Sequence, residues 1–394
     1  KGGFIMNYVL KFMKRNILIT LLQIIQLSVI FVVIAFMIST INYRMQYYTP
    51  VKDILSTNGA LVDVAATGSN DYMTDSGILK KFPKVTNITG VKFGNLLSGD
   101  DSYNYYVYDD KIIDQVPLKL DKGDISTLKK TDKNYCLITH DMKYDVGDEI
   151  ALQEPDEEDP EKYRDIIFTV AGIISDNQLI YGQMGCGGDY RNLYCEYRSD
   201  DGFEPFIIVS DNLTKKLKMT AVYSDYVVLN YPKDSYDKTK LIQKLSEDWA
   251  TYQYSTDEMR ENSNKYIYEE LYTIFPIIIC VMILTIFTAI IANAISSKRN
   301  LKKLGIMYLC GSTWKKCIRL SMSNSIIIGI VSFIISMIVL HIGKLTFWAD
   351  TTVTLGSWQI ISCITIMLIY ISISMITPFL MIRKVQPRDV LKSE

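Results

Sequence analysis

The sequence has few of the residues from which catalytic and metal sites are built. It contains 2 histidines and 7 cysteines in 394 residues, and no two cysteines form a CxxC pair. It also has no GxxxxGK[ST] phosphate-binding loop, no GxSxG nucleophile motif and no HExxH zinc motif. We therefore expect no metal site, no catalytic residue and no cofactor in this chain, and we expect that it is not an enzyme.

Charged side chains are absent from four long apolar stretches, at residues 16–43, 271–297, 320–343 and 351–382. Each exceeds the roughly 20 helical residues that cross a bilayer core. Buried helices of a soluble protein are the alternative, but such helices rarely stay apolar on all sides over this length. For the first stretch a cleaved signal peptide is a second alternative, although its apolar part is too long. We predict four transmembrane helices.

Basic residues are concentrated in some of the segments between these stretches. Residues 1–16 hold four basic residues and residues 298–319 hold seven, both without an acid, whereas residues 42–270 hold 26 basic and 40 acidic residues. Because Lys and Arg near span ends remain in the cytoplasm, we expect both termini and residues 298–319 inside the plasma membrane and residues 42–270 outside it. Abundant Ile, Lys, Asn and Tyr favour an AT-rich genome and a Gram-positive bacterium.

The predicted fold class is an α-helical membrane protein with four transmembrane helices and a mixed α+β extracytoplasmic domain on helical stalks. The expected order is a cytoplasmic basic terminus (1–16), first span (17–41), extracytoplasmic domain with stalk helices (42–270), second span (271–297), cytoplasmic basic loop (298–319), third span (320–343), short outer loop (344–357), fourth span (358–382) and cytoplasmic tail (383–394).

Within the outer segment, β-branched runs bounded by turn residues predict strands at 60–65, 103–108, 136–139, 148–152, 165–174, 206–210 and 225–230. Helical patterns occur at 76–83 and 210–219. The latter part of 235–276 predicts a long stalk helix, and the segment after the first span predicts a shorter one that is interrupted near Pro50.

Two features of the outer segment leave alternatives open. Cys186 and Cys195 flank the loop CGGDYRNLYC and could form a disulfide in an oxidising compartment, or remain two free thiols. The acidic run at 154–165 could be a calcium loop, but two prolines between predicted strands favour a solvated hairpin tip. In the spans, Gln23, Gln26, Ser28 and Asn293 are expected to form hydrogen bonds between helices rather than bind a substrate.

The cytoplasmic segment KRNLKKLGIMYLCGSTWKKCIRL (298–320) combines basic and apolar residues. It predicts two short amphipathic pieces punctuated by Gly305 and Gly311, with Ser312 as the N-cap of the second. A loop that only fixes topology and touches lipid phosphates is the alternative. That role does not require apolar residues, whereas a helix that docks in a groove of a cytosolic partner does. The apolar set is Leu304, Ile306, Met307, Leu309 and Trp314.

In this order of elements the sequence resembles the permease subunits of MacB/FtsX-type ABC transporters, also called type VII or mechanotransmission transporters. The resemblance covers nearly the whole chain. It includes LKKFPKVTNITGV (79–91), YDVGDEIAL (144–152), FTVAGII (168–174), the 298–320 segment and the tail RKVQPRDVLKSE. The segment 181–205, with its Tyr-rich loop, does not match the family's pattern.

The resemblance implies a separate cytosolic ABC ATPase that binds ATP and Mg, and a second permease copy in a homodimer or heterodimer. It also implies that residues 1–16 form a cytoplasmic amphipathic elbow and that residues 298–319 form the coupling-helix loop. The residues expected to contact the ATPase are Leu304, Gly305, Ile306, Met307, Gly311, Ser312 and Trp314. It implies motion of the outer domain, with a peptide or lipid-linked client and no nucleic acid. Because a Gram-positive bacterium has no second membrane for a tripartite pump, we favour export of or resistance to antimicrobial peptides over lipoprotein sorting. The alternatives are a regulator that activates an extracellular partner such as a cell-wall hydrolase, and a receptor without energy coupling.

Overall fold

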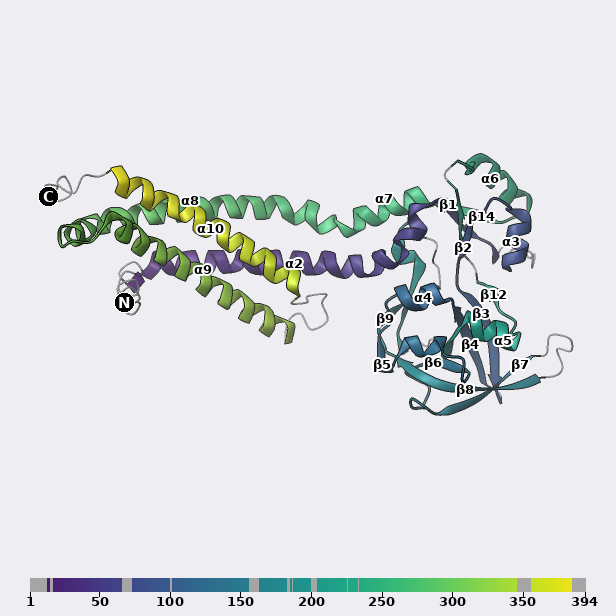
Figure 1. Cartoon of the computed structure of the whole chain (residues 1–394). Coiled ribbons are helices and arrows are strands. Elements are labelled where there is room, and N and C mark those ends of the chain that lie inside the picture. Colours follow the sequence, from purple (N-terminus) through teal and green to yellow (C-terminus); the bar gives the residue numbers. More distant parts are fainter. Residues whose placement is uncertain are drawn as a thin grey trace. The chain divides into compact units, whose positions relative to one another are not determined.

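The computed structural model describes residues 13–14, 17–65, 73–99, 101–155, 163–182, 185, 187–199, 204–224, 226–232, 234–345 and 356–384. The chain divides into two compact units (Figure 1). Residues 1–43 and 268–394 form one, called here the helical unit, and residues 44–267 form the other, called the sheet unit.

Four segments among the described residues are long and apolar enough to cross a membrane: Ile17–Ser56, Thr256–Ile295, Ser323–Gly343 and Ser357–Ile376. The helices that carry them are α2 (Ile17–Ser56), α7 (Thr256–Ile267), α8 (Glu269–Leu309), α9 (Trp314–Leu345) and α10 (Ser357–Lys384). In the helical unit α10 packs against both α8 and α9. The core that these helices share with α2 includes Leu27 and Phe31 of α2 and Leu340 of α9.

Four polar side chains in the helical unit were predicted to bond to neighbouring helices, and three of them do. Ser28 Oγ donates to the Ser332 carbonyl at 3.1 Å, and Asn293 Nδ2 donates to the Ser374 carbonyl at 3.3 Å. Gln26 accepts from Thr288 at 3.1 Å. Gln23 differs, because its buried Nε2 has no hydrogen-bond partner among the described residues.

The sheet unit contains a large lobe built on an eight-stranded sheet. The strand order is β12-β3-β4-β11-β6-β8-β5, and β7 pairs with β3 and β8. The strands are β3 (Lys92–Ser98), β4 (Asp101–Tyr108), β5 (Leu120–Gly123), β6 (Tyr135–Thr139), β7 (Glu149–Pro155), β8 (Tyr163–Ile174), β11 (Phe206–Ser210) and β12 (Val222–Tyr223), with helices α4 (Asp110–Gln115), η3 (Ile125–Lys129) and α5 (Asp211–Leu217).

A small lobe completes the sheet unit. Its four-stranded sheet has the order β14-β1-β13-β2 and packs on α3 and α6 through a core that includes Val227, Ile78 and Leu241. The elements are β1 (Asn58–Asp63), α3 (Asp75–Lys81), β2 (Asn87–Thr89), β13 (Tyr226–Tyr231), α6 (Lys238–Glu247) and β14 (Thr251–Ser255). A separate hairpin pairs β9 (Gln178–Tyr181) with β10 (Tyr194–Tyr197), and η4 (Tyr190–Leu193) lies in its loop.

All seven predicted strands and both predicted short helices are present, but two details of the prediction were wrong. The helix α2 is not interrupted near Pro50. Although this proline lacks an N–H, Val51 and Leu55 are fully buried beside it, and their packing offsets the missing hydrogen bond. The acidic run is not wholly solvated, because Glu154 is only 1% exposed at the end of β7. Residues 156–162, the tip of that run, lie outside the described residues.

Candidate functional site

The β9–β10 hairpin is fastened to the large lobe by tyrosines. Tyr108 of β4 donates its hydroxyl to the Tyr181 carbonyl at 2.8 Å. Tyr197 of β10 donates its hydroxyl to Asp141 Oδ2 at 3.2 Å. The centre of its ring lies 5.5 Å from the centre of the Phe206 ring of β11. Tyr108, Tyr181 and Tyr197 are at most 1% exposed, so this attachment is part of the lobe's packed interior.

The loop of the same hairpin and the start of β10 are fastened to two helices. Tyr194 donates its hydroxyl to the Tyr47 carbonyl of α2 at 2.9 Å. On α7, Ser263 Oγ accepts from the Tyr190 N–H at 2.9 Å, and Asn262 Nδ2 donates to the Gly188 carbonyl at 3.0 Å. The hairpin therefore joins α2, α7 and the large lobe.

A stacked group of side chains completes this junction. The guanidinium of Arg44 lies 4.1 Å from the centre of the Tyr266 ring, and that of Arg191 lies 3.7 Å from it. Arg44 also donates to the Tyr266 carbonyl, which ties α2 to α7 directly. Arg191 is held by Asp189, with Nη2 to Oδ2 at 2.7 Å. Such cation–π contacts contribute about 0.5–2 kcal/mol each, depending on burial.

We call this junction the tyrosine clasp and define it as Tyr181, Tyr190 and Tyr194 of the hairpin, Tyr47, Tyr48 and Tyr266 of the helices, and the two arginines on the Tyr266 ring, Arg44 and Arg191. The tyrosine rings contact one another in pairs, with ring centres 5.4–6.0 Å apart. Burial raises the pKa of the Tyr181, Tyr190 and Tyr194 phenols far above their usual value. The hydrogen bond to Asp189 likewise raises the pKa of Arg191. The phenols of the hairpin therefore stay neutral, and Arg191 stays charged, across the physiological pH range.

The sequence did not reveal the clasp as a site. Its members come from four separate segments, and the hairpin loop was the part of the chain that fitted no family pattern. A signal was present in the composition, because 27 of the 394 residues are tyrosine. Several are grouped at 47–48 and 190–197, and large side chains with a polar tip are suited to such a junction.

The turn between α8 and α9 holds the residues predicted to contact an ATPase. Gly311 has φ +91°, and its N–H donates to the Tyr308 carbonyl at 3.0 Å. The Ser312 N–H donates to the Met307 carbonyl at 3.0 Å. This pair of bonds is a Schellman motif, in which a residue with positive φ closes the helix end, so Gly311 is required by the backbone.

The local structure of the turn differs from the prediction in two ways. Gly305 is buried within α8 and does not separate a short piece from the span. Helix α9 begins at Trp314, so Thr313 precedes its first residue and Ser312 lies one position too early to be the N-cap. Ile306 is 48% exposed and Met307 is half-buried. Leu304 and Trp314 lie in α8 and α9, and their side chains are not among those described.

Other predicted sites are less informative. Cys195 lies in β10 with a half-buried thiol, while Cys186 is outside the described residues, so their disulfide stays a prediction. In the part of the chain that the structure describes, no group of three or more His, Cys, Asp or Glu side chains could hold a metal ion.

No model of a protein family matches this chain, and no curated protein matches it significantly. Among solved structures, half of the chain is similar to 98% of the extracellular domain of the noncanonic ABC-type transporter YknZ from Gram-positive bacteria, with 12% identity and a TM-score of 0.27. Likewise, 52% of the chain is similar to 92% of the periplasmic region of MacB from Actinobacillus actinomycetemcomitans, with 11% identity and a TM-score of 0.25. Likeness at this level does not assign a function.

Proposed function

We propose that this chain is the permease subunit of a MacB/FtsX-type ABC transporter, in which a separate cytosolic ATPase drives motion of the sheet unit outside the membrane. The tyrosine clasp is the observation that supports this most. It bonds α2 and α7, the two helices at the chain connections between the units, to each other and, through the hairpin, to the large lobe. A displacement of one helix against the other would strain these bonds and move the lobe.

The composition of the spans supports an external energy source. The four apolar stretches contain no Asp, Glu, Lys or Arg, whereas ion-coupled carriers place ionisable groups inside the membrane. Polar side chains such as Ser28 and Asn293 are engaged with neighbouring helices. A client then need not pass between the spans, and the work would enter from the ATPase at the α8–α9 turn.

A cationic peptide is the client that the charge of the outer segment favours. Residues 42–270 hold 40 acidic against 26 basic residues, and a field of one sign concentrates ligands of the other. We therefore propose export of, or resistance to, antimicrobial peptides, by a dimer of permeases with two ATPase subunits.

The test is ATP hydrolysis by an ATPase encoded beside this chain, reconstituted with it in lipid nanodiscs. Ile306→Asp should lower both co-purification and stimulated hydrolysis at least fivefold, because a charge replaces an exposed apolar anchor of the turn. Ile242→Asp, at a 40% exposed apolar position in the sheet unit, is the matched control and should change neither. Absence of association, or association that ignores Ile306→Asp, would exclude this coupling role.

A further inference from the structure

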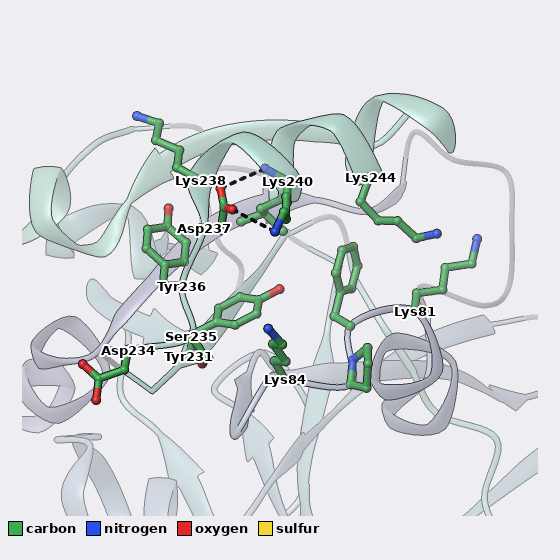
Figure 2. A pocket seen from close by; sticks show the side chains of 13 residues that line it. Lys81, Lys84, Tyr231, Asp234, Ser235, Tyr236, Asp237, Lys238, Lys240 and Lys244 are labelled. Atoms are coloured by element: carbon green, nitrogen blue, oxygen red, sulfur yellow. Dashed lines mark hydrogen bonds and ion pairs between the residues drawn. The ribbon is translucent and has the colours of Figure 1, made fainter.

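A pocket of about 670 Å³ opens on the small lobe, between the end of α3 and the helix α6 (Figure 2). This volume is typical of sites for small molecules, about 300–1,000 Å³. The lining residues are Lys81, Phe82, Pro83, Lys84, Tyr231, Asp234, Ser235, Tyr236, Asp237, Lys238, Lys240, Leu241 and Lys244.

The charge of the pocket is opposite to that of its surroundings. Five lysines and two aspartates line it, a net of +3, within a segment that has 14 more acidic than basic residues. Figure 2 shows the ammonium groups of Lys84 and Lys240 and the hydroxyl of Tyr231 pointing toward the middle of the pocket, while Lys238 and Asp234 point away.

Existing ion pairs leave these ammonium groups available. Lys240 Nζ is 3.5 Å from Asp237, and Lys244 Nζ is 3.7 Å from Glu247. Exposed pairs at such distances contribute little, so an anion can compete for them. Among the described residues no carboxylate lies within 4 Å of Lys84 Nζ. The closer pair, Lys81 with Asp248 at 2.8 Å, ties the end of α3 to that of α6 and shapes the rim.

Asp237 offsets only part of the positive charge of the pocket, because one of its oxygens is held by the end of a helix. Its Oδ1 accepts from the Lys240 N–H at 3.2 Å and caps the first turn of α6. A capping carboxylate is fixed by the helix end and cannot turn toward a ligand's cation. The pocket thus keeps positive charge and hydrogen-bond donors, from Lys84, Lys240 and Tyr231, available to a ligand.

The types of residue that line the pocket indicate which class of ligand it binds. All of the lining cations are lysines, which bind phosphate oxygens as compact point charges with three donors each. The rings of Tyr231 and Tyr236 lie 5.6 Å apart at 48°, and Phe82, Pro83 and Leu241 add apolar surface. Lysines beside aromatic faces suit a phosphate carried on a C–H-rich sugar or polyol.

We propose that this pocket binds a phosphate ester of a sugar or polyol. Lys84 and Lys240 contact the phosphate oxygens, the Tyr231 hydroxyl donates to one of them, and the aromatic rings pack against the carbon skeleton. Burial raises the pKa of Tyr231 to about 12, so its hydroxyl remains a donor at neutral pH. The site needs neither the ATPase nor the α8–α9 turn, so it is independent of the proposed transport function.

The probe is sn-glycerol 3-phosphate, titrated calorimetrically into the full chain in phosphatidylcholine nanodiscs. We expect a Kd on the order of 0.1–1 mM, typical of a few charge-assisted contacts at an open site, and no heat with glycerol. The phosphate ester could be a soluble compound or a lipid headgroup. Weaker binding of the probe in nanodiscs that contain phosphatidylglycerol would indicate the lipid, and equal binding would indicate the soluble compound.

Substitutions locate the site. Lys84→Gln with Lys240→Gln should weaken binding at least about tenfold, since two of the charge-assisted bonds are lost. Lys130→Gln with Lys265→Gln removes the same charge from exposed positions outside the pocket and should change the Kd less than about twofold. No heat from the wild-type chain at about 10 mM probe, or equal weakening in both double variants, would overturn the proposal.

Discussion

Glu154 is a charged side chain placed inside the large lobe. Its Oε1 accepts from the Tyr105 hydroxyl at 3.2 Å and from the Thr220 N–H at 2.7 Å, while Oε2 accepts from Arg164 Nε at 3.0 Å. Glu154→Leu leaves all three donors without this partner. We expect a loss of about 2–3 kcal/mol in unfolding free energy, at the low end for a broken buried pair because Arg164 is 36% exposed.

A native cysteine of the large lobe can report the unfolding of this variant. Cys136 of β6 is fully buried, and burial raises the pKa of its thiol to about 12, so alkylation requires unfolding. Mass spectrometry of alkylated Cys136 against urea concentration should show a lower midpoint for Glu154→Leu. Glu149 lies on the same strand and is exposed. Glu149→Gln should therefore change the unfolding free energy by less than about 0.5 kcal/mol. Equal midpoints for the two variants would contradict the burial argument.

Substitutions at Gly311 and Ser312 distinguish the role of the backbone from that of the side chain in the α8–α9 turn. A side chain with a branched Cβ is strained at φ +91°, so Gly311→Val should cost about 1–2 kcal/mol locally and open the end of α8. Hydrogen exchange of residues 306–316 should rise. Ser312→Ala keeps the N–H that bonds to Met307 and should leave exchange unchanged. A rise with Ser312→Ala instead would favour the N-cap role predicted from the sequence.

Among the elements, the β9–β10 hairpin is held to α7 in part by one hydroxyl. Ser263 Oγ is fully buried and is the acceptor for the Tyr190 N–H. Ser263→Ala leaves that N–H unpaired, which costs about 1–3 kcal/mol. We expect faster hydrogen exchange at residues 187–193 and lower client-stimulated ATP hydrolysis, with normal expression. Ser246→Ala, at an exposed position of α6, is the control. Unchanged exchange in the hairpin would show that the clasp does not depend on this bond.

The start of α7 has a capping box that depends on pH. The Ser255 N–H and hydroxyl donate to Glu258 Oε2 at 2.9 and 2.8 Å, and the Glu258 N–H donates to Ser255 Oγ at 3.2 Å. The bonds from Ser255 lower the pKa of Glu258. The stabilisation is therefore complete above the unfolded-state pKa, about 4.3, and is lost as pH falls through the lower folded-state value.

Because this stabilisation is lost at low pH, hydrogen exchange at the start of α7 should depend on pH. Between pH 6 and pH 3, protection of residues 256–262, corrected for intrinsic exchange, should fall in the wild-type chain. It should fall less in Glu258→Gln, whose amide keeps an acceptor but does not titrate. Glu261→Gln, exposed on the same helix, should behave as wild type. Identical pH profiles for Glu258→Gln and wild type would contradict the role of the carboxylate.

Some elements could be predicted from the sequence and others could not, for physical reasons. β8 and β11 were evident because continuous β-branched runs mark strands buried on both faces. β9, β10 and β14 contain Gln, Glu, Thr and Tyr in segments of at most five residues, which carry no clear period. The clasp was not predictable because its contacts join residues as far apart as 222 positions. The continuation of α2 past Pro50 likewise depends on tertiary packing.

For the whole molecule, the distribution of charge and hydropathy along the sequence predicts the orientation in the membrane. The basic α8–α9 turn and the acidic sheet unit are expected on opposite sides of the membrane, because Lys and Arg that flank spans stay in the cytoplasm. The proposed coupling requires this arrangement, since the ATPase is cytosolic and the motion is external. The proposed phosphate pocket, on the small lobe, would then face the outside.

Cysteine labelling in intact cells tests the arrangement directly. Cys310, at the end of α8, has an exposed thiol and serves as the native reporter of the turn. Lys130→Cys introduces an exposed thiol in the sheet unit. A membrane-impermeant maleimide should modify this introduced thiol within minutes and spare Cys310, and permeabilised cells should show both modified, as read by mass spectrometry of each peptide. Labelling of Cys310 in intact cells would place the turn outside, where no ATP-driven partner can reach it.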